Sequence, residues 1–110
     1  MKTDLIEIFQ TIRAALQPYT TLGFTCRINS EEKYDLWSDK NIEVDGEKRT
    51  ETFFASLVIE DGHVTFSLLP EGLAEYERPM IMTELDDLTL NLIEDKVAAG
   101  YKIFKEQEWV

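Results

Sequence analysis

The sequence predicts an α+β fold: a two-layer sandwich in which an N-terminal helix and a long C-terminal helix pack on one face of an antiparallel sheet of about five strands. Three observations lead to this prediction. Apolar residues recur with a helical period near both ends of the chain. They alternate with polar residues through much of the middle, and two Asp-Gly pairs mark tight turns there. A chain of 110 residues fits one domain, which we place at residues 1–110.

The first helix is expected over residues 4–17. Asp4 can cap its start, with Glu7 three positions later as in a capping box, and Pro18 stops it. An apolar stripe with three- and four-residue spacing runs along one side of this helix and consists of Leu5, Ile8, Phe9, Ile12 and Leu16.

Three alternating segments follow the helix. In GFTCRIN, the apolar face of the alternation consists of Phe24, Cys26 and Ile28, and in KYDLWS, Trp37 lies on the polar face. The stretch NIEVDGEKRT alternates before its Asp-Gly pair, which predicts a hairpin because both central turn positions favour positive φ.

The stretch FFASLVIEDGHVTFSLLP, residues 53–70, predicts a second hairpin with a definite register. A two-residue turn at Asp61-Gly62 pairs Glu60 with His63, so one face is wholly apolar and the two helices are expected to cover it. That apolar face consists of Ala55, Leu57, Ile59, Val64, Phe66 and Leu68. The opposite face is mixed and holds Phe54, Ser56, Val58, Glu60, His63, Thr65 and Ser67.

The rest of the chain predicts a short edge strand and the second helix. After Pro70 we expect one helical turn near Leu73 and Tyr76, and then an edge strand at residues 80–82. A helical stripe begins at about Asp87 and includes Leu90, Ile93, Val97, Tyr101 and Phe104. Gly100 interrupts this stripe at a cost of roughly 1 kcal/mol relative to alanine, which suggests close packing there. Trp109 is expected to dock on the domain.

The charge balance argues against nucleic acid and membrane surfaces as partners. The chain has 11 basic and 22 acidic residues, a net charge of −11, and such a surface repels phosphate groups. Residues 60–95 contain 10 acids and one base, Arg78. No apolar run approaches the roughly 20 residues of a membrane span, and the first residues do not form a secretory signal. A single cysteine, Cys26, excludes an internal disulfide, and a cytoplasmic location is expected.

Two long segments resemble the YdhG-like family of small bacterial domains of unknown function. They are YDLWSDKNIEVDGEKRTETFFASLVIEDGHVTFSLLP and LDDLTLNLIEDKVAAGYKIFKEQEWV, which ends in the Gly100-Tyr101 step and the pair Trp109-Val110. Between these segments the chain is shorter than its relatives and lacks their Lys-rich, Cys-containing segment. The family is similar in layout to frataxin, and a member has been proposed as an iron chaperone, so the resemblance implies metal handling as an alternative function. The acidic metal ridge of frataxin lies on the first helix and strand, where this chain has only Asp4 and Glu7, together with Arg27.

Several residues have a chemical and a structural interpretation. His63 could bind a metal or act as a base, and an ion pair with Glu60 across the turn is the simpler account. Cys26 and His63 could form a nucleophile and base, although the apolar neighbours of Cys26 favour a packing role. The stretch NIEVDGEKRTET resembles a calcium loop but lacks the first Asp and the final Glu.

The acidic segment offers a candidate site for a hard cation. Glu84, Asp86 and Asp87 could hold iron, Ca²⁺ or Mg²⁺ through carboxylate oxygens. The alternative is that Asp86 and Asp87 cap the second helix, whose N-terminus favours negative charge. No other cofactor is expected.

The mixed sheet face is the main candidate for function. With no helix over it, aromatic rings and small hydroxyls there could bind a ligand, an unknown protein partner or a second copy of the chain. The candidate residues are Trp37, Phe54, Ser56, Val58, His63, Thr65 and Ser67. The sequence therefore predicts a non-catalytic binding or interaction module that uses this open face, with acidic metal handling as the alternative.

Overall fold

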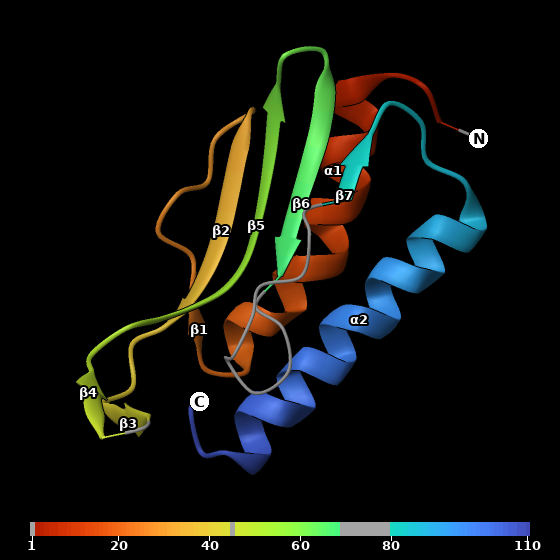
Figure 1. Cartoon of the computed structure of the whole chain (residues 1–110). Coiled ribbons are helices and arrows are strands. Elements are labelled where there is room, and N and C mark those ends of the chain that lie inside the picture. Colours follow the sequence, from red (N-terminus) through yellow and green to blue (C-terminus); the bar gives the residue numbers. More distant parts are fainter. Residues whose placement is uncertain (1, 45, 69–79) are drawn as a thin grey trace.

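The computed structural model describes residues 2–44, 46–68 and 80–110. It confirms the predicted α+β architecture (Figure 1). The helices are α1 (Leu5–Leu16), the 3-10 helix η1 (Gln17–Thr21) and α2 (Asp87–Glu106). The strands are β1 (Phe24–Thr25), β2 (Lys33–Ser38), β3 (Ile42–Val44), β4 (Glu47–Arg49), β5 (Thr52–Glu60), β6 (His63–Leu68) and β7 (Met80–Met82).

Five strands form the main sheet in the order β1-β2-β5-β6-β7, and all neighbours are antiparallel. Helices α1 and α2 pack on the same face of this sheet, and the core lies between the two layers (Figure 1). The β3–β4 hairpin forms its own two-stranded sheet and extends away from the body of the domain (Figure 1). The expected helical turn near Leu73 and Tyr76 lies outside the described residues.

The local signals for the helix starts act as expected. The Asp4 carboxylate accepts hydrogen bonds from the backbone N–H groups of Ile6 and Glu7, which caps α1. Asp86 caps α2 by accepting a hydrogen bond from the Thr89 N–H at 2.7 Å. Pro18 follows the end of α1, and the chain continues directly into the 3-10 helix η1. Proline is tolerated there because the first turn of a helix does not need its N–H group.

The β5–β6 hairpin has the predicted register, from the Glu60–His63 pair to the Ala55–Leu68 pair. Asp61 and Gly62 have φ values of 48° and 79°, the positive values that a tight two-residue turn requires. Edge strand β7 also forms at the expected residues and pairs with β6.

The predicted position of Phe54 on the mixed face is wrong. A β-bulge shifts the β2–β5 register between Leu36 and Trp37, so that Leu36 lies opposite Ala55 while Trp37 lies opposite Phe53. The extra residue reverses the alternation at the start of β5. Phe54 therefore points into the core, where it is fully buried and stacks on Phe24 with ring centroids 4.1 Å apart.

The strand expected across residues 23–29 is shorter than predicted. Strand β1 ends at Thr25, and the Asp35 carboxylate then accepts hydrogen bonds from the N–H groups of Arg27 and Ile28 at 3.0 and 2.9 Å. A side chain thus takes the place of a strand partner, and Ile28 is 38% exposed rather than in the core.

Close packing at Gly100 is confirmed. A Cβ atom placed on Gly100 would lie 3.2 Å from Cε1 of Phe54, so the missing side chain lets α2 approach the sheet directly over this ring. Ring contacts from Phe54 to Tyr19 and Phe104 then connect β5 to η1 and α2.

The C-terminal residues dock as expected. Glu108 has a φ of 61°, and the N–H groups of Glu108 and Trp109 donate to the carbonyls of Lys105 and Phe104. This pattern is a Schellman motif, which turns the chain sharply at the end of a helix. Trp109 is consequently 7% exposed, and the hydroxyl of Ser38 in β2 donates to its carbonyl.

Candidate functional site

The face of the main sheet opposite the helices carries six side chains from β5, β6 and β7 that bear no charge. We call this set the open strip: Phe53, Ser56, Val58, Thr65, Ser67 and Ile81. The pairs Ser56–Ser67 and Val58–Thr65 lie directly across β5 and β6, and Ile81 lies opposite Thr65 on β7. Ile81 is 66% exposed, although it is a large apolar residue on an edge strand.

The sequence prediction of this face missed two residues of the open strip. Phe53 takes the place that Phe54 was expected to fill, because the bulge that exchanges them has no signature in the sequence. Ile81 stands between Met80, which is half-buried, and Met82, which is buried. Alternation within the short edge strand could have identified Ile81, since the two methionines share the core side.

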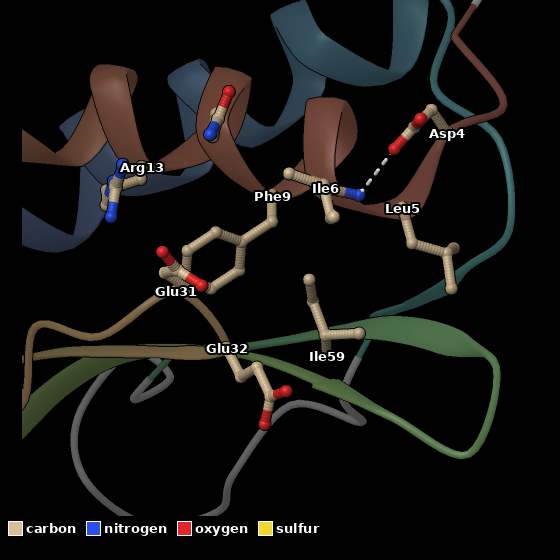
Figure 2. A pocket seen from close by; sticks show the side chains of 9 residues that line it. Asp4, Leu5, Ile6, Phe9, Arg13, Glu31, Glu32 and Ile59 are labelled. Carbon is tan, nitrogen blue, oxygen red and sulfur yellow. Dashed lines mark hydrogen bonds between the residues drawn. The ribbon is translucent and has the colours of Figure 1, made fainter.

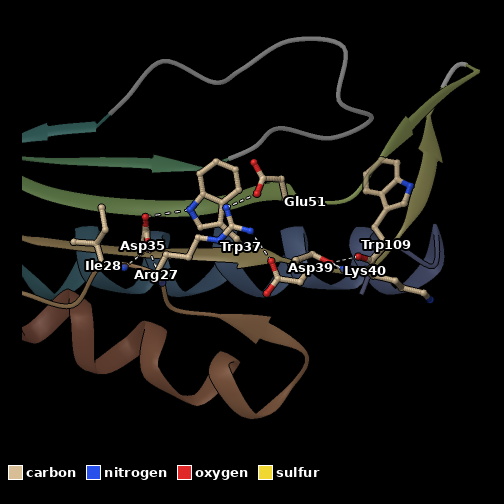
Figure 3. Close-up of polar contacts among 9 residues, drawn as sticks. Arg27, Ile28, Asp35, Trp37, Asp39, Lys40, Glu51 and Trp109 are labelled. Atoms are coloured by element: carbon tan, nitrogen blue, oxygen red, sulfur yellow. Dashed lines mark hydrogen bonds and ion pairs between the residues drawn. The ribbon is translucent and has the colours of Figure 1, made fainter.

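Trp37 lies at the β1 side of the open strip, and its ring is already in contact with Arg27. The Arg27 guanidinium lies over this ring at 4.7 Å from the centroid and forms ion pairs of 2.6 Å with Asp39 and Glu51 (Figure 3). Hydrogen bonds from the Thr25 hydroxyl and the Arg27 guanidinium hold the pKa of Asp39 below its usual range. Trp37 thus belongs to the polar border of the face.

Asp35 fixes the orientation of this border. Its side chain is 7% exposed on β2, and its second carboxylate oxygen accepts a hydrogen bond from the Trp37 indole N–H at 3.1 Å (Figure 3). With the Arg27 and Ile28 N–H groups on the other oxygen, this buried carboxylate is well satisfied. Asp35 therefore has a structural role.

His63 lies at the turn end of the same face. It is half-buried and pairs with Glu60 in the hairpin register. Among the ion pairs found for the described residues, none joins these two side chains. His63 is the first residue of β6, so it lies at the end of the hairpin and away from Ser67 near the other end of the strand.

The acidic candidates do not converge. Asp86 caps α2, and its hydrogen bonds with Thr89 lower the pKa of this carboxyl group. Asp87 lies in the first turn of α2, where a negative charge is favourable. Within residues 2–44, 46–68 and 80–110, no group of three His, Cys, Asp or Glu side chains is arranged to hold a metal ion.

Cys26 is half-buried beside Tyr34, and its Sγ donates to the carbonyl of Ile28 at 3.2 Å. Burial raises the pKa of the Cys26 thiol, and burial likewise raises the pKa of Tyr34 to about 12. A nucleophilic cysteine requires the opposite shift, because the thiolate is the reactive form.

We expect slow alkylation of Cys26 in the folded protein. At pH 8 its rate constant with iodoacetamide should be several-fold below that of the same protein in concentrated urea, because less thiolate is present when the pKa is raised. The rate should rise with pH through a midpoint above that of a free cysteine. Equal rates in the folded and unfolded protein would contradict this account.

Comparisons with protein families, curated proteins and solved structures found no match to this chain. In the described part of the chain, no helix is both long and apolar enough to span a bilayer.

Proposed function

We propose that this protein is a non-catalytic binding module and that the open strip is its docking surface for a partner protein. The observation that carries this proposal is the lack of charge on the strip. Charged residues make up 30% of the chain, yet the outward positions from Phe53 to Val58 on β5 and from Thr65 to Ser67 on β6 are all apolar, aromatic or hydroxylic. The charged residues of this face lie around these positions, with Lys33 and Asp35 on the neighbouring β2 and Glu60 at the turn. Depletion of charge with retention of aromatic and apolar side chains characterises the centre of protein interfaces.

The charge of the whole molecule favours a partner with a basic surface around an apolar patch. The net charge is −11, and Asp39 and Glu51 stand beside Trp37 at one border of the face. Opposite charges around a neutral centre accelerate association and exclude wrong partners. The same net charge opposes self-association, because two copies would bring like charges together.

The chemistry of Cys26 supports a non-catalytic role. Its raised pKa keeps the sulfur protonated at neutral pH, and its hydrogen bond to the Ile28 carbonyl holds it within the structure. A thiol in this state packs as a small apolar group.

Site-specific photo-crosslinking in the native host tests the proposed surface. A photoreactive amino acid is placed at Ile81 on the open strip or at Leu88 on α2, which is 80% exposed and serves as a matched apolar control. We expect one basic protein to be captured through position 81 and not through position 88. That protein, once purified, should bind the unmodified chain saturably.

Three results would contradict the proposal. They are equal capture through both positions, capture of a second copy of this chain through position 81, and a captured protein that fails to bind the purified chain saturably.

A further inference from the structure

A groove lies on the other side of the sheet from the open strip, between α1 and the neighbouring ends of β2 and β5 (Figure 2). Its volume is about 710 Å³, within the range of sites that hold small organic ligands. The groove forms where α1 does not fully cover the last residues of β5.

One part of the groove wall is apolar and is formed by residues of α1 and β5. Ile6 of α1 is 59% exposed and points toward the gap, while Ile59 of β5 points up from the sheet toward the helix (Figure 2). Leu5 is half-buried beside them, and Phe9 is fully buried at the bottom. Exposure of Ile6 to water is unfavourable, and an apolar ligand body seated here would remove that surface from solvent.

The charged groups at the groove differ in how far they are already engaged. Arg13 lies over the Phe9 ring at 5.4 Å, and its Nη1 donates to the Ser30 carbonyl at 3.4 Å. Asp4 is occupied as the cap of α1. Glu31, by contrast, is exposed, lines the groove and takes part in none of the ion pairs found for the described residues (Figure 2).

The acids outnumber the base at this groove, since Asp4 and Glu31 line it together with Arg13, while the Glu32 side chain points away from α1 (Figure 2). An unpaired carboxylate next to apolar surface is best matched by a cation that carries an apolar body. An anionic ligand would be repelled by this excess of negative charge. It could pair only with Arg13, which already contacts the Phe9 ring and the Ser30 carbonyl.

We propose that this groove is a second binding site, which takes a small organic cation with an apolar body, such as an arylalkylammonium ion. The ammonium group lies at Glu31 and the apolar body lies along Ile6 and Ile59. This site is on the opposite face from the open strip, so it is separate from the proposed function and is tested independently of it.

A titration of the full chain followed by amide NMR tests the ligand class. The three probes share one phenylbutyl body and differ in charge: 4-phenylbutylammonium, 4-phenylbutanol and 5-phenylpentanoate. We expect saturable shifts of the Ile6, Glu31 and Ile59 resonances with the ammonium compound, weaker binding of the alcohol by about threefold or more, and the weakest binding of the carboxylate. The proposal is overturned if the carboxylate binds as tightly as the ammonium compound, or if the ammonium compound gives no saturable shift below about 10 mM.

Variants at exposed positions then test the two parts of the site. Glu31→Gln should weaken binding of 4-phenylbutylammonium about threefold, and Ile6→Ser should weaken binding of all three probes. Glu43→Gln, a matched loss of an exposed carboxylate on β3, should leave the affinity unchanged. Equal affinities for Glu31→Gln and Glu43→Gln would remove Glu31 from the site and overturn the proposed mode of recognition.

Discussion

Phe54→Ala is expected to lower the free energy of unfolding by about 3–5 kcal/mol, whereas Phe53→Ala should lower it by roughly 1–2 kcal/mol. Phe54 is fully buried and contacts the rings of Phe24 and Phe104, so its loss leaves a cavity in the core. Phe53 is half-buried on the opposite face, where its ring lies 5.5 Å from the Trp37 ring between centroids.

Urea unfolding of the two variants measures this difference between neighbouring, chemically identical residues. Their m values should agree, since the same surface is exposed on unfolding. Equal costs for the two substitutions, or a larger cost for Phe53→Ala, would mean that the bulge between β2 and β5 is absent in solution.

Trp109→Ala is the second substitution with a large expected effect, a loss of about 3–4 kcal/mol in the free energy of unfolding. The indole packs edge-on against Phe104 with centroids 5.4 Å apart, and the backbone of Trp109 is held by Phe104 and Ser38. Removal of the indole exposes the end of α2 around Phe104. Ser38→Ala should cost about 1 kcal/mol, because the Trp109 carbonyl then loses its side-chain donor.

A neighbouring substitution provides the control for the docked C-terminus. Glu108 adopts a left-handed conformation that costs most residues about 1 kcal/mol, so Glu108→Gly should leave stability unchanged or raise it slightly. Thermal unfolding followed by circular dichroism compares the variants. If Trp109→Ala unfolds at the same temperature as the unmodified protein, then the C-terminal residues do not contribute to the fold as described.

The parts of the fold that could be predicted from sequence depend on local chemistry. The caps at Asp4 and Asp86 and the turn at Asp61-Gly62 are decided by a few adjacent residues, and the hairpin register follows from its turn. Close packing at Gly100 was predictable because glycine in a helix is unfavourable without a packing reason.

The parts that could not be predicted depend on contacts between distant residues. The bulge lets Phe53 meet Trp37 while Phe54 meets Phe24, and no feature near residues 53–54 distinguishes this arrangement from simple alternation. Strand β1 ends early for a similar reason, because the competing acceptor, Asp35, lies on another strand.

The candidate site was predictable only in part. The hydroxyl and valine positions of β5 and β6 follow from the hairpin register and were correctly placed on the open face. The stacking of the Arg27 guanidinium on the Trp37 ring depends on tertiary contacts, which the sequence pattern does not specify. The groove beside Ile59 depends on how far α1 reaches along the sheet, which a sequence period does not specify.

The affinity of the purified partner for two lysine variants tests the open strip most directly. Ile81→Lys places a charge on the strip and Leu88→Lys places the same charge on α2, in each case at an exposed apolar residue. Isothermal titration calorimetry should show binding to Ile81→Lys at least about tenfold weaker than to the unmodified chain, and binding to Leu88→Lys within about twofold of it. Equal affinities for the two variants, or a larger loss for Leu88→Lys, would contradict the open strip as the binding surface.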